Sequence, residues 1–152
     1  MTAILFVCLG NICRSPLAEG LMRHTADTAG LAHRFTLDSA GCGGWHTGGQ
    51  PDRRSIACAA RHGLDISGQR ARQVNAGDFD AFDLILGMDR DNVRHLTRIQ
   101  PPGSRARIAL YLEEALGRSK DVPDPYYGDD RDFEAVFALC TEASEALTGA
   151  LG

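Results

Sequence analysis

The sequence has no run of about 20 apolar residues, the length that a membrane-spanning helix requires, so we expect no such helix. It also lacks an excess of basic residues. The 16 Lys and Arg face 20 Asp and Glu, a net charge of -4, which argues against a nucleic-acid-binding protein. The N-terminal apolar run is short and has no basic lead, so it does not resemble a signal peptide. Five cysteines, an odd number, favour free thiols in a reducing compartment, and we expect a cytoplasmic protein.

What is present is an ordinary globular composition, 43% hydrophobic and 24% charged. A chain of 152 residues corresponds to one domain, 1–152, whose core needs no metal or disulfide. Apolar runs that are typical of buried strands alternate with segments of helical periodicity. We expect strands at 3–8, 35–40, 82–88 and 106–112, and helices at about 16–29, 51–62, 90–99, 111–116 and 133–151. This alternation predicts an α/β fold with a parallel sheet.

The loop after the first predicted strand carries the most chemical information. Cys8 ends the strand, five residues separate it from Arg14, and Ser15-Pro16 is a typical helix start with serine as N-cap. Amides of a short loop and of a helix N-terminus bind anions, and an arginine can grip two phosphate oxygens. The same positive surroundings favour the thiolate form of a cysteine that lies beneath the anion, and a thiolate is a nucleophile. Ser15 can donate its hydroxyl to the sulfur, and Gly10 suits a backbone with positive φ.

Residues 7–16 resemble the phosphate-binding loop of the low-molecular-weight protein tyrosine phosphatases, and the resemblance extends over essentially the whole chain. The further landmarks, in order, are Asp38-Ser39-Ala40-Gly41, Trp45-His46, Pro51-Asp52-Arg53-Arg54, His62-Gly63, Arg72-Gln73, Met88-Asp89 and Asp124-Pro125-Tyr126-Tyr127. One departure is Cys42, where the family usually has threonine.

The resemblance implies a four-stranded parallel sheet with helices on both faces, and catalysis through a cysteinyl-phosphate. Cys8 is then the nucleophile, Arg14 binds the phosphoryl oxygens and Asn11 holds the loop's unusual backbone. The implied phosphate-binding loop comprises Leu9, Gly10, Asn11, Ile12, Cys13 and Arg14. The residues implied to support it from behind are Glu19, Ser39 and His62. No metal or organic cofactor is implied.

An aryl phosphate ester also needs an acid to protonate its leaving oxygen. One loop offers several candidates, Asp121, Asp124, Asp129 and Asp130, and composition does not choose among them. Asp129 or Asp130 can instead cap the last helix. The resemblance selects Asp124, because Asp124-Pro125-Tyr126-Tyr127 matches the acid loop of the family.

Aromatic residues near these motifs are candidates for the walls of a substrate crevice. Trp45, Tyr126 and Tyr127 can stack on a phenyl ring, and Ile12 offers an apolar surface where related arginine phosphatases carry threonine. Cys13 lies in the same curled loop as Cys8, so we predict that the two form a reversible disulfide on oxidation.

In two places a cysteine and a histidine are four residues apart, a spacing at which two residues can supply half of the ligands of a metal ion. They are Cys58 with His62, and Cys42 with His46. Neither pair has further ligands nearby in the sequence, so we interpret both as packing residues.

The leading hypothesis is therefore a phosphatase that acts on phosphotyrosine in proteins, a tyrosine kinase being one candidate partner, with a monomer favoured. The alternatives are an arginine phosphatase, a phosphate-binding module without turnover, and an arsenate reductase on the same fold. No cysteine lies between Cys58 and Cys140, so an arsenate reductase would need an external thiol.

Overall fold

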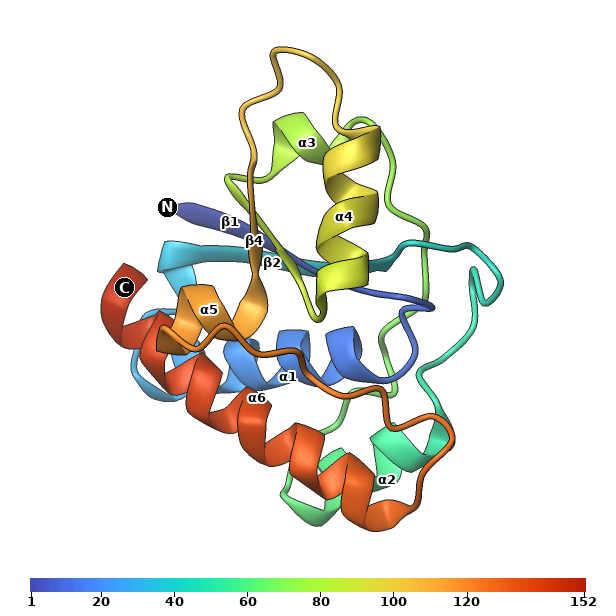
Figure 1. Ribbon diagram of the computed structural model, residues 1–152. Coiled ribbons are helices and arrows are strands. Elements are labelled where there is room, and N and C mark those ends of the chain that lie inside the picture. The colour runs from blue at the N-terminus through green and yellow to red at the C-terminus, as the bar shows by residue number, and fades with distance from the viewer.

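Four parallel strands form the centre of the fold in the order β2-β1-β3-β4, in a computed structural model that describes all residues, 1–152 (Figure 1). The strands are β1 (Thr2–Cys8), β2 (Phe35–Gly41), β3 (Leu84–Gly87) and β4 (Arg107–Leu110). The helices are α1 (Arg14–Thr28), α2 (Arg53–Arg61), α3 (Asp78–Ala81), α4 (Arg90–Ile99), α5 (Tyr111–Leu116) and α6 (Asp130–Leu151), with a short 3-10 helix η1 (Ala32–Arg34) before β2.

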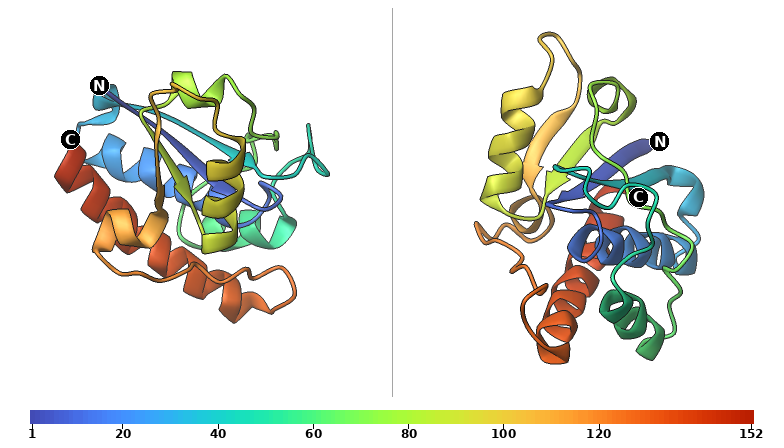
Figure 2. Two further views of the ribbon diagram at one scale, coloured as in Figure 1. Left: turned by 45° about the horizontal axis from the view of Figure 1, so that its top comes forward. Right: turned by 90° about the vertical axis from the view of Figure 1, so that its right-hand side faces the viewer.

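Helices cover both faces of the sheet, as predicted. Helices α1, α5 and α6 lie on one face with α2 beside them, and α3 and α4 lie on the other (Figures 1 and 2). The central strand β1 is buried on both faces, which explains its unbroken apolar sequence. Side chains alternate along it, so that Phe6 and Cys8 pack toward α1 while Leu5 and Val7 pack in the second core cluster on the opposite face.

The element boundaries follow the sequence patterns with small shifts. Helix α4 occupies the predicted range 90–99, and the fourth apolar run turns helical at Tyr111 as expected. Gly63, with φ of 80°, ends the α2 segment in the left-handed conformation, which confirms its predicted role. Helix α1 begins earlier than predicted, because Cys13 and not Ser15 occupies the N-cap position. No helix combines the length and apolar character that crossing a membrane requires.

The parallel arrangement places the carboxyl ends of all four strands at one edge. The loop that follows β1, the segment that follows β2 and the chain just beyond β3 meet there. Both chain termini lie at the other side of the molecule (Figures 1 and 2). Ligands of open α/β sheets bind outside the carboxyl ends of the strands, so this edge is where a site is expected.

Candidate active site

The loop between β1 and α1 is held in an uncommon conformation by one asparagine. Asn11 has φ of 58° and is the only residue other than glycine in the left-handed region. Its side-chain amide donates to the Oγ atoms of Ser15 and Ser39 at 2.9 and 3.0 Å, and its Oδ1 accepts from the Arg72 amide at 3.0 Å. The expectation that Gly10 takes the positive φ was wrong. Asparagine tolerates this region, and three side-chain hydrogen bonds hold it there.

Gly41 allows the loop to approach β2 closely. A Cβ at this position would lie 3.0 Å from the Gly10 carbonyl carbon and 3.1 Å from the Asn11 nitrogen. The neighbouring Cys42 amide donates to the Cys8 carbonyl at 2.9 Å, which ties the start of the loop to the end of β2. The packing of the β1–α1 loop against β2 therefore requires a glycine at position 41.

Two of the predicted supporting residues lie directly behind Asn11. Ser39, which accepts from Asn11, donates its hydroxyl to Glu19 Oε1 at 2.7 Å. Glu19 is only 5% exposed, and burial raises its carboxyl pKa although Ser39 and Arg23 act in the opposite direction. A buried chain of hydrogen bonds therefore runs from Glu19 through Ser39 to the loop.

Ser15 contacts the sulfur of Cys8. The Ser15 Oγ lies 3.0 Å from Cys8 Sγ and also accepts from the Asn11 amide. Since the hydroxyl oxygen is already an acceptor, its hydrogen can point to a Cys8 thiolate. This contact replaces the N-cap role that the sequence suggested for Ser15, and it agrees with the predicted donation to sulfur.

The N-terminus of α1 is left without a side-chain cap. The N–H groups of Arg14 and Ser15 in its first turn have no intrahelical acceptor, as in any helix, and they follow directly on the loop amides of residues 9–13. A helix N-terminus also carries partial positive charge. The loop and the first turn together form a suitable binding site for a phosphate.

Arg14 is a buried cation held by several acceptors. Its Nη1 donates to Asp89 Oδ2 at 2.7 Å and to the Val122 carbonyl at 3.0 Å, and its Nη2 lies 3.7 Å from Asp124 Oδ2. Burial would lower the pKa of Arg14, but Cys8, Asp89 and Asp124 together raise it above its usual value. Arg14 therefore remains charged at the floor of the site.

Asp89 was missed by the sequence reasoning, although Met88-Asp89 was among the landmarks. It follows β3 at the carboxyl edge, and its Oδ1 caps α4 by accepting from the Asn92 amide at 2.8 Å. Its other oxygen holds Arg14. The signal that could have identified it is its position, because residues just after neighbouring parallel strands meet at one edge.

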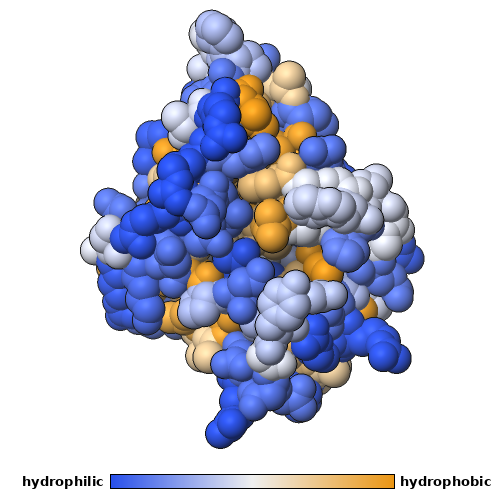
Figure 3. Space-filling view, turned by 45° about the vertical axis from the view of Figure 1, so that its right-hand side comes forward, coloured by the Kyte–Doolittle hydropathy of each residue, from blue (hydrophilic) through white to orange (hydrophobic).

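A crevice of about 230 Å³ opens above the loop. It is lined by Cys8, Leu9, Gly10, Ile12, Cys13, Arg14, Trp45, His46, Asp124, Tyr126 and Tyr127. The space-filling view of this side shows apolar surface gathered in a hollow between hydrophilic rims (Figure 3). The structure thus brings the predicted nucleophile, acid and aromatic residues together in one cavity.

Asp124 reaches this crevice because its loop is anchored on the sheet. The Val122 amide donates to the Met88 carbonyl just after β3 at 2.8 Å. Asp124 Oδ1 accepts from the Tyr126 amide at 3.1 Å, which orients the carboxylate, and its side chain is 41% exposed. Its second oxygen faces Arg14.

Two of the other three candidate carboxylates have structural partners. Asp121 pairs with Arg90 at 2.9 Å, and Asp129 caps α6 by accepting from the Arg131 amide at 3.0 Å. Asp130 is the exposed first residue of that helix. Of the four candidate acids, Asp124 alone lines the crevice.

The aromatic residues form the outer walls. Tyr126 packs edge-on against Tyr127 with ring centroids 4.9 Å apart, and the Arg54 guanidinium lies 5.3 Å from its ring centre. Trp45 is 71% and Tyr127 95% exposed, so each has a large apolar surface open to a bound ring. Half-buried Ile12 lines the same crevice.

Two histidines differ from expectation. His46 lines the crevice and had been assigned only to packing, with its adjacency to Trp45 as the available signal. His62 was expected to support the loop and does not. It lies just beyond α2, where its ring stacks on Phe137 at 4.1 Å and its Nε2 lies 2.7 Å from Glu134. Its sequence position next to a helix end did not reveal that α6 packs there.

Cys13 is buried at the crevice and close to Cys8. Burial, assisted by the negative charges of Asp52, Cys8 and Asp124, raises the pKa of Cys13 to about 12. Cys13 is therefore a neutral thiol next to the candidate nucleophile, and all five cysteines are free.

Comparisons with known proteins agree with this geometry. The sequence profile of the family described as "Low molecular weight phosphotyrosine protein phosphatase" matches residues 3–152. A Schizosaccharomyces pombe protein of that name is 47% identical over 144 residues, covering 93% of this chain and 92% of its own length. The crystal structure of YfkJ from Bacillus subtilis superposes with a TM-score of 0.89 at 40% identity, covering 99% and 94% of the two chains. That of the Drosophila arginine phosphatase DARP superposes with a TM-score of 0.90 at 31% identity, covering 99% and 97% of the two chains.

Proposed function

The chain belongs to the low molecular weight phosphotyrosine protein phosphatase family, and on that premise we propose that it hydrolyses phosphotyrosine in proteins through a phosphocysteine formed on Cys8. The observation that carries the proposal is the crevice in which Cys8, Arg14 and Asp124 meet beneath aromatic walls. A catalysed release of inorganic phosphate from a phosphotyrosine peptide is the direct test. A phosphate-binding module without turnover would release none.

In the first step the phosphoryl group lies over the loop, with its oxygens on the loop amides and on the Arg14 guanidinium. The Cys8 thiolate attacks phosphorus, the S–P bond forms and the bond to the phenolic oxygen breaks. Asp124 donates its proton to that oxygen, so tyrosine leaves as the neutral phenol. The distance of 3.7 Å between Arg14 Nη2 and Asp124 Oδ2 supports this arrangement, because the proposed acid is then next to the guanidinium proposed to bind phosphate.

In the second step the Asp124 carboxylate takes a proton from water. The water oxygen attacks phosphorus, the S–P bond breaks and inorganic phosphate leaves. The Cys8 thiolate is then the leaving group, and the Ser15 hydroxyl at 3.0 Å stabilises it by donating a hydrogen bond. Asn11, Ser39 and Glu19 act through the loop by holding its backbone.

We expect specificity for phosphotyrosine over phosphoserine and phosphoarginine. Trp45 and Tyr126 line the crevice together with Cys8, so we expect a phenyl ring to stack on them while its phosphate reaches the loop, and a shorter serine side chain to fall short of Cys8. Ile12 offers an apolar surface to the ring and no hydroxyl to a phosphoguanidinium. Peptides of one sequence that carry each phosphoresidue should therefore give the highest kcat/KM for phosphotyrosine.

The matched variant for this prediction is Ile12→Thr, which adds a hydroxyl and removes apolar surface. It should lower the preference for phosphotyrosine, measured as kcat/KM for the phosphotyrosine peptide divided by kcat/KM for the phosphoarginine peptide. Equal kcat/KM for phosphoserine and phosphotyrosine in the wild type would contradict the crevice argument. Arsenate reduction with an external thiol that is as fast as phosphate release would instead support the reductase alternative.

We also propose that the enzyme is redox-sensitive through Cys8 and Cys13. Hydrogen peroxide transfers a hydroxyl group to the Cys8 thiolate, giving a sulfenic acid and hydroxide. The Cys13 thiol attacks that sulfur, the S–S bond forms, and the sulfenic oxygen leaves as water. Both cysteines line one crevice, which supports the pairing.

Mild peroxide is expected to inactivate the wild type, with dithiothreitol restoring activity. Cys13→Ser should keep basal activity and recover less, because Cys8 then proceeds to irreversible oxides. Peptide mapping of the oxidised wild type should show a Cys8–Cys13 bridge. A missing bridge, together with equal recovery of Cys13→Ser and wild type, would leave Cys13 as a packing residue. Cys140→Ser is the matched control, because Cys140 is a buried core residue of α6 and does not line the crevice.

The proposed setting is the cytoplasm, where a reactive thiol stays reduced. Five free cysteines support it. The proposed partners are phosphotyrosine-containing proteins, a tyrosine kinase among them. A monomer is favoured, because four of the six exposed large apolar side chains, Leu9, Trp45, Tyr126 and Tyr127, line the substrate crevice.

A further inference from the structure

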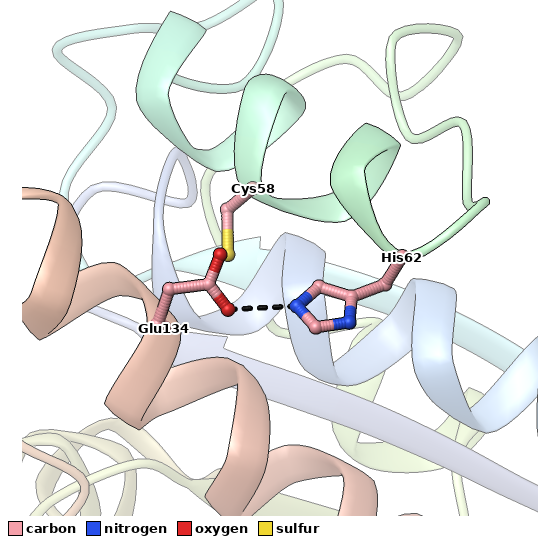
Figure 4. A group of neighbouring side chains, drawn as sticks. All are labelled: Cys58, His62 and Glu134. Atoms are coloured by element: carbon pink, nitrogen blue, oxygen red, sulfur yellow. Dashed lines mark hydrogen bonds and ion pairs between the residues drawn. The ribbon is translucent and has the colours of Figure 1, made fainter.

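Three side chains that can bind metal converge on the side of the molecule formed by α2 and α6. Cys58 lies on α2, His62 follows the end of that helix, and Glu134 lies in the first turns of α6. Figure 4 shows the Cys58 sulfur and the His62 ring both directed at the Glu134 carboxylate. The sequence offered Cys58 and His62 as half of a site, and the fold supplies the third residue from 72 positions away.

The distances fit one small ion. One ligand atom from each residue lies within 4.8 Å of the others, and His62 Nε2 is 2.7 Å from Glu134 Oε2. Sulfur and nitrogen bound to one zinc ion are at most ~4.4 Å apart, the sum of the two bond lengths. A small rotation of the side chains therefore brings all three onto one ion. The stacking of the His62 ring on Phe137 already orients the imidazole.

The donor set selects the ion. Calcium and magnesium take oxygen ligands, whereas a combination of thiolate, imidazole and carboxylate ligands is typical of zinc. The side chains of His62 and Glu134 are 43% and 37% exposed, so an ion enters from solvent and a water completes its coordination. We propose that Cys58, His62 and Glu134 form a zinc site, separate from the catalytic crevice, that links α2 to α6.

Binding of the metal ion would break the ion pair between Arg61 and Glu134 that the structure shows. Glu134 Oε1 accepts from Arg61 Nε at 2.8 Å, and the ion takes over this carboxylate while the exposed guanidinium turns to solvent. Cys58 releases its thiol proton to solvent as its sulfur binds the ion. Burial and the nearby Glu134 raise the pKa of Cys58 to about 11, so the thiol is protonated until a cation replaces the proton.

The test uses cobalt(II) as a spectroscopic substitute for zinc, because cobalt bound to a thiolate has a charge-transfer absorption band. All proteins carry Cys8→Ser, so the crevice contributes no nucleophilic thiolate. We expect a band that saturates at one cobalt per chain and that zinc abolishes by displacement. Adding Cys58→Ser should remove the band, and adding Glu134→Gln should weaken binding about tenfold or more, the scale on which changes around a metal reduce affinity.

Two further variants separate a metal site from a plain ion-pair cluster. Arg61→Ala removes the cation that competes for Glu134 and should tighten cobalt binding. Glu142→Gln, on the same helix and paired with Arg118, is the matched control and should leave it unchanged. Zinc should also raise the Tm of the Cys8→Ser protein and not that of its Glu134→Gln derivative.

Circular dichroism and, in the wild-type Cys8 background, phosphatase activity show whether Cys58→Ser is folded. Absence of a cobalt band overturns the proposal, as does a band that persists in the folded Cys58→Ser protein. Equal cobalt affinity in the Arg61→Ala, Glu134→Gln and parent proteins overturns it as well, whatever Cys58→Ser does.

Discussion

Cys8→Ser is expected to lower turnover of a phosphotyrosine peptide by at least about 10⁴-fold, the scale of losing a catalytic nucleophile. Inorganic phosphate should still bind, because the loop amides and the Arg14 guanidinium remain in place. The structure gives the reason: Cys8 ends β1 beneath the loop, and its sulfur contacts the Ser15 hydroxyl at 3.0 Å. Initial rates and calorimetric titration with phosphate measure the two effects separately.

The matched control is Cys42→Ser, which changes a second buried cysteine near the same edge. The Cys42 side chain packs in the core cluster on the opposite face of the sheet from Cys8. Its effect on turnover should be small beside that of Cys8→Ser. A purified Cys8→Ser enzyme with substantial activity would show that another group performs the attack.

Asp124→Ala should slow hydrolysis of phenyl phosphate by roughly 10²–10⁴-fold, the range for loss of a general acid. The first step then expels an unprotonated phenolate. The loss should be smaller for p-nitrophenyl phosphate, whose leaving group needs less protonation. A plot of rate against leaving-group pKa for a series of aryl phosphates measures this, and its slope should be steeper for the variant.

Asp121→Ala and Asp129→Ala are the controls for this prediction. Their carboxylates pair with Arg90 and cap α6, so we expect near wild-type rates and at most a small loss of stability. If either control loses activity on phosphotyrosine while Asp124→Ala keeps it, the acid has been misassigned.

The parts of the site that are local in sequence could be predicted from it. Cys8, Arg14 and Ser15 lie within one strand–loop–helix unit, so their spacing sets their geometry. Asp124 required the resemblance to a family, because the Val122–Met88 hydrogen bond that brings it to the crevice joins residues far apart in the chain. Asp89 was missed for the same reason, since only the sheet order places β3 beside β1.

The errors have physical causes as well. Glycine is the usual residue for positive φ, and the sequence does not show that Asn11 gains three side-chain hydrogen bonds by adopting it. Helical spacing places Cys58 and His62 on one face but does not say which element covers that face. The structure shows α6 there, and its Glu134 takes His62 away from the role expected for it.

The most direct test of the mechanism is to trap the covalent intermediate. Asp124→Ala lacks the proposed base of the second step, so the phosphoenzyme should accumulate during turnover of p-nitrophenyl phosphate. Mass spectrometry after a rapid denaturing quench should find up to one phosphoryl group per chain, on the peptide that contains Cys8. Phosphate release with no phosphoenzyme at any time, or a phosphoryl group on Ser15 or another residue, would contradict a Cys8 mechanism.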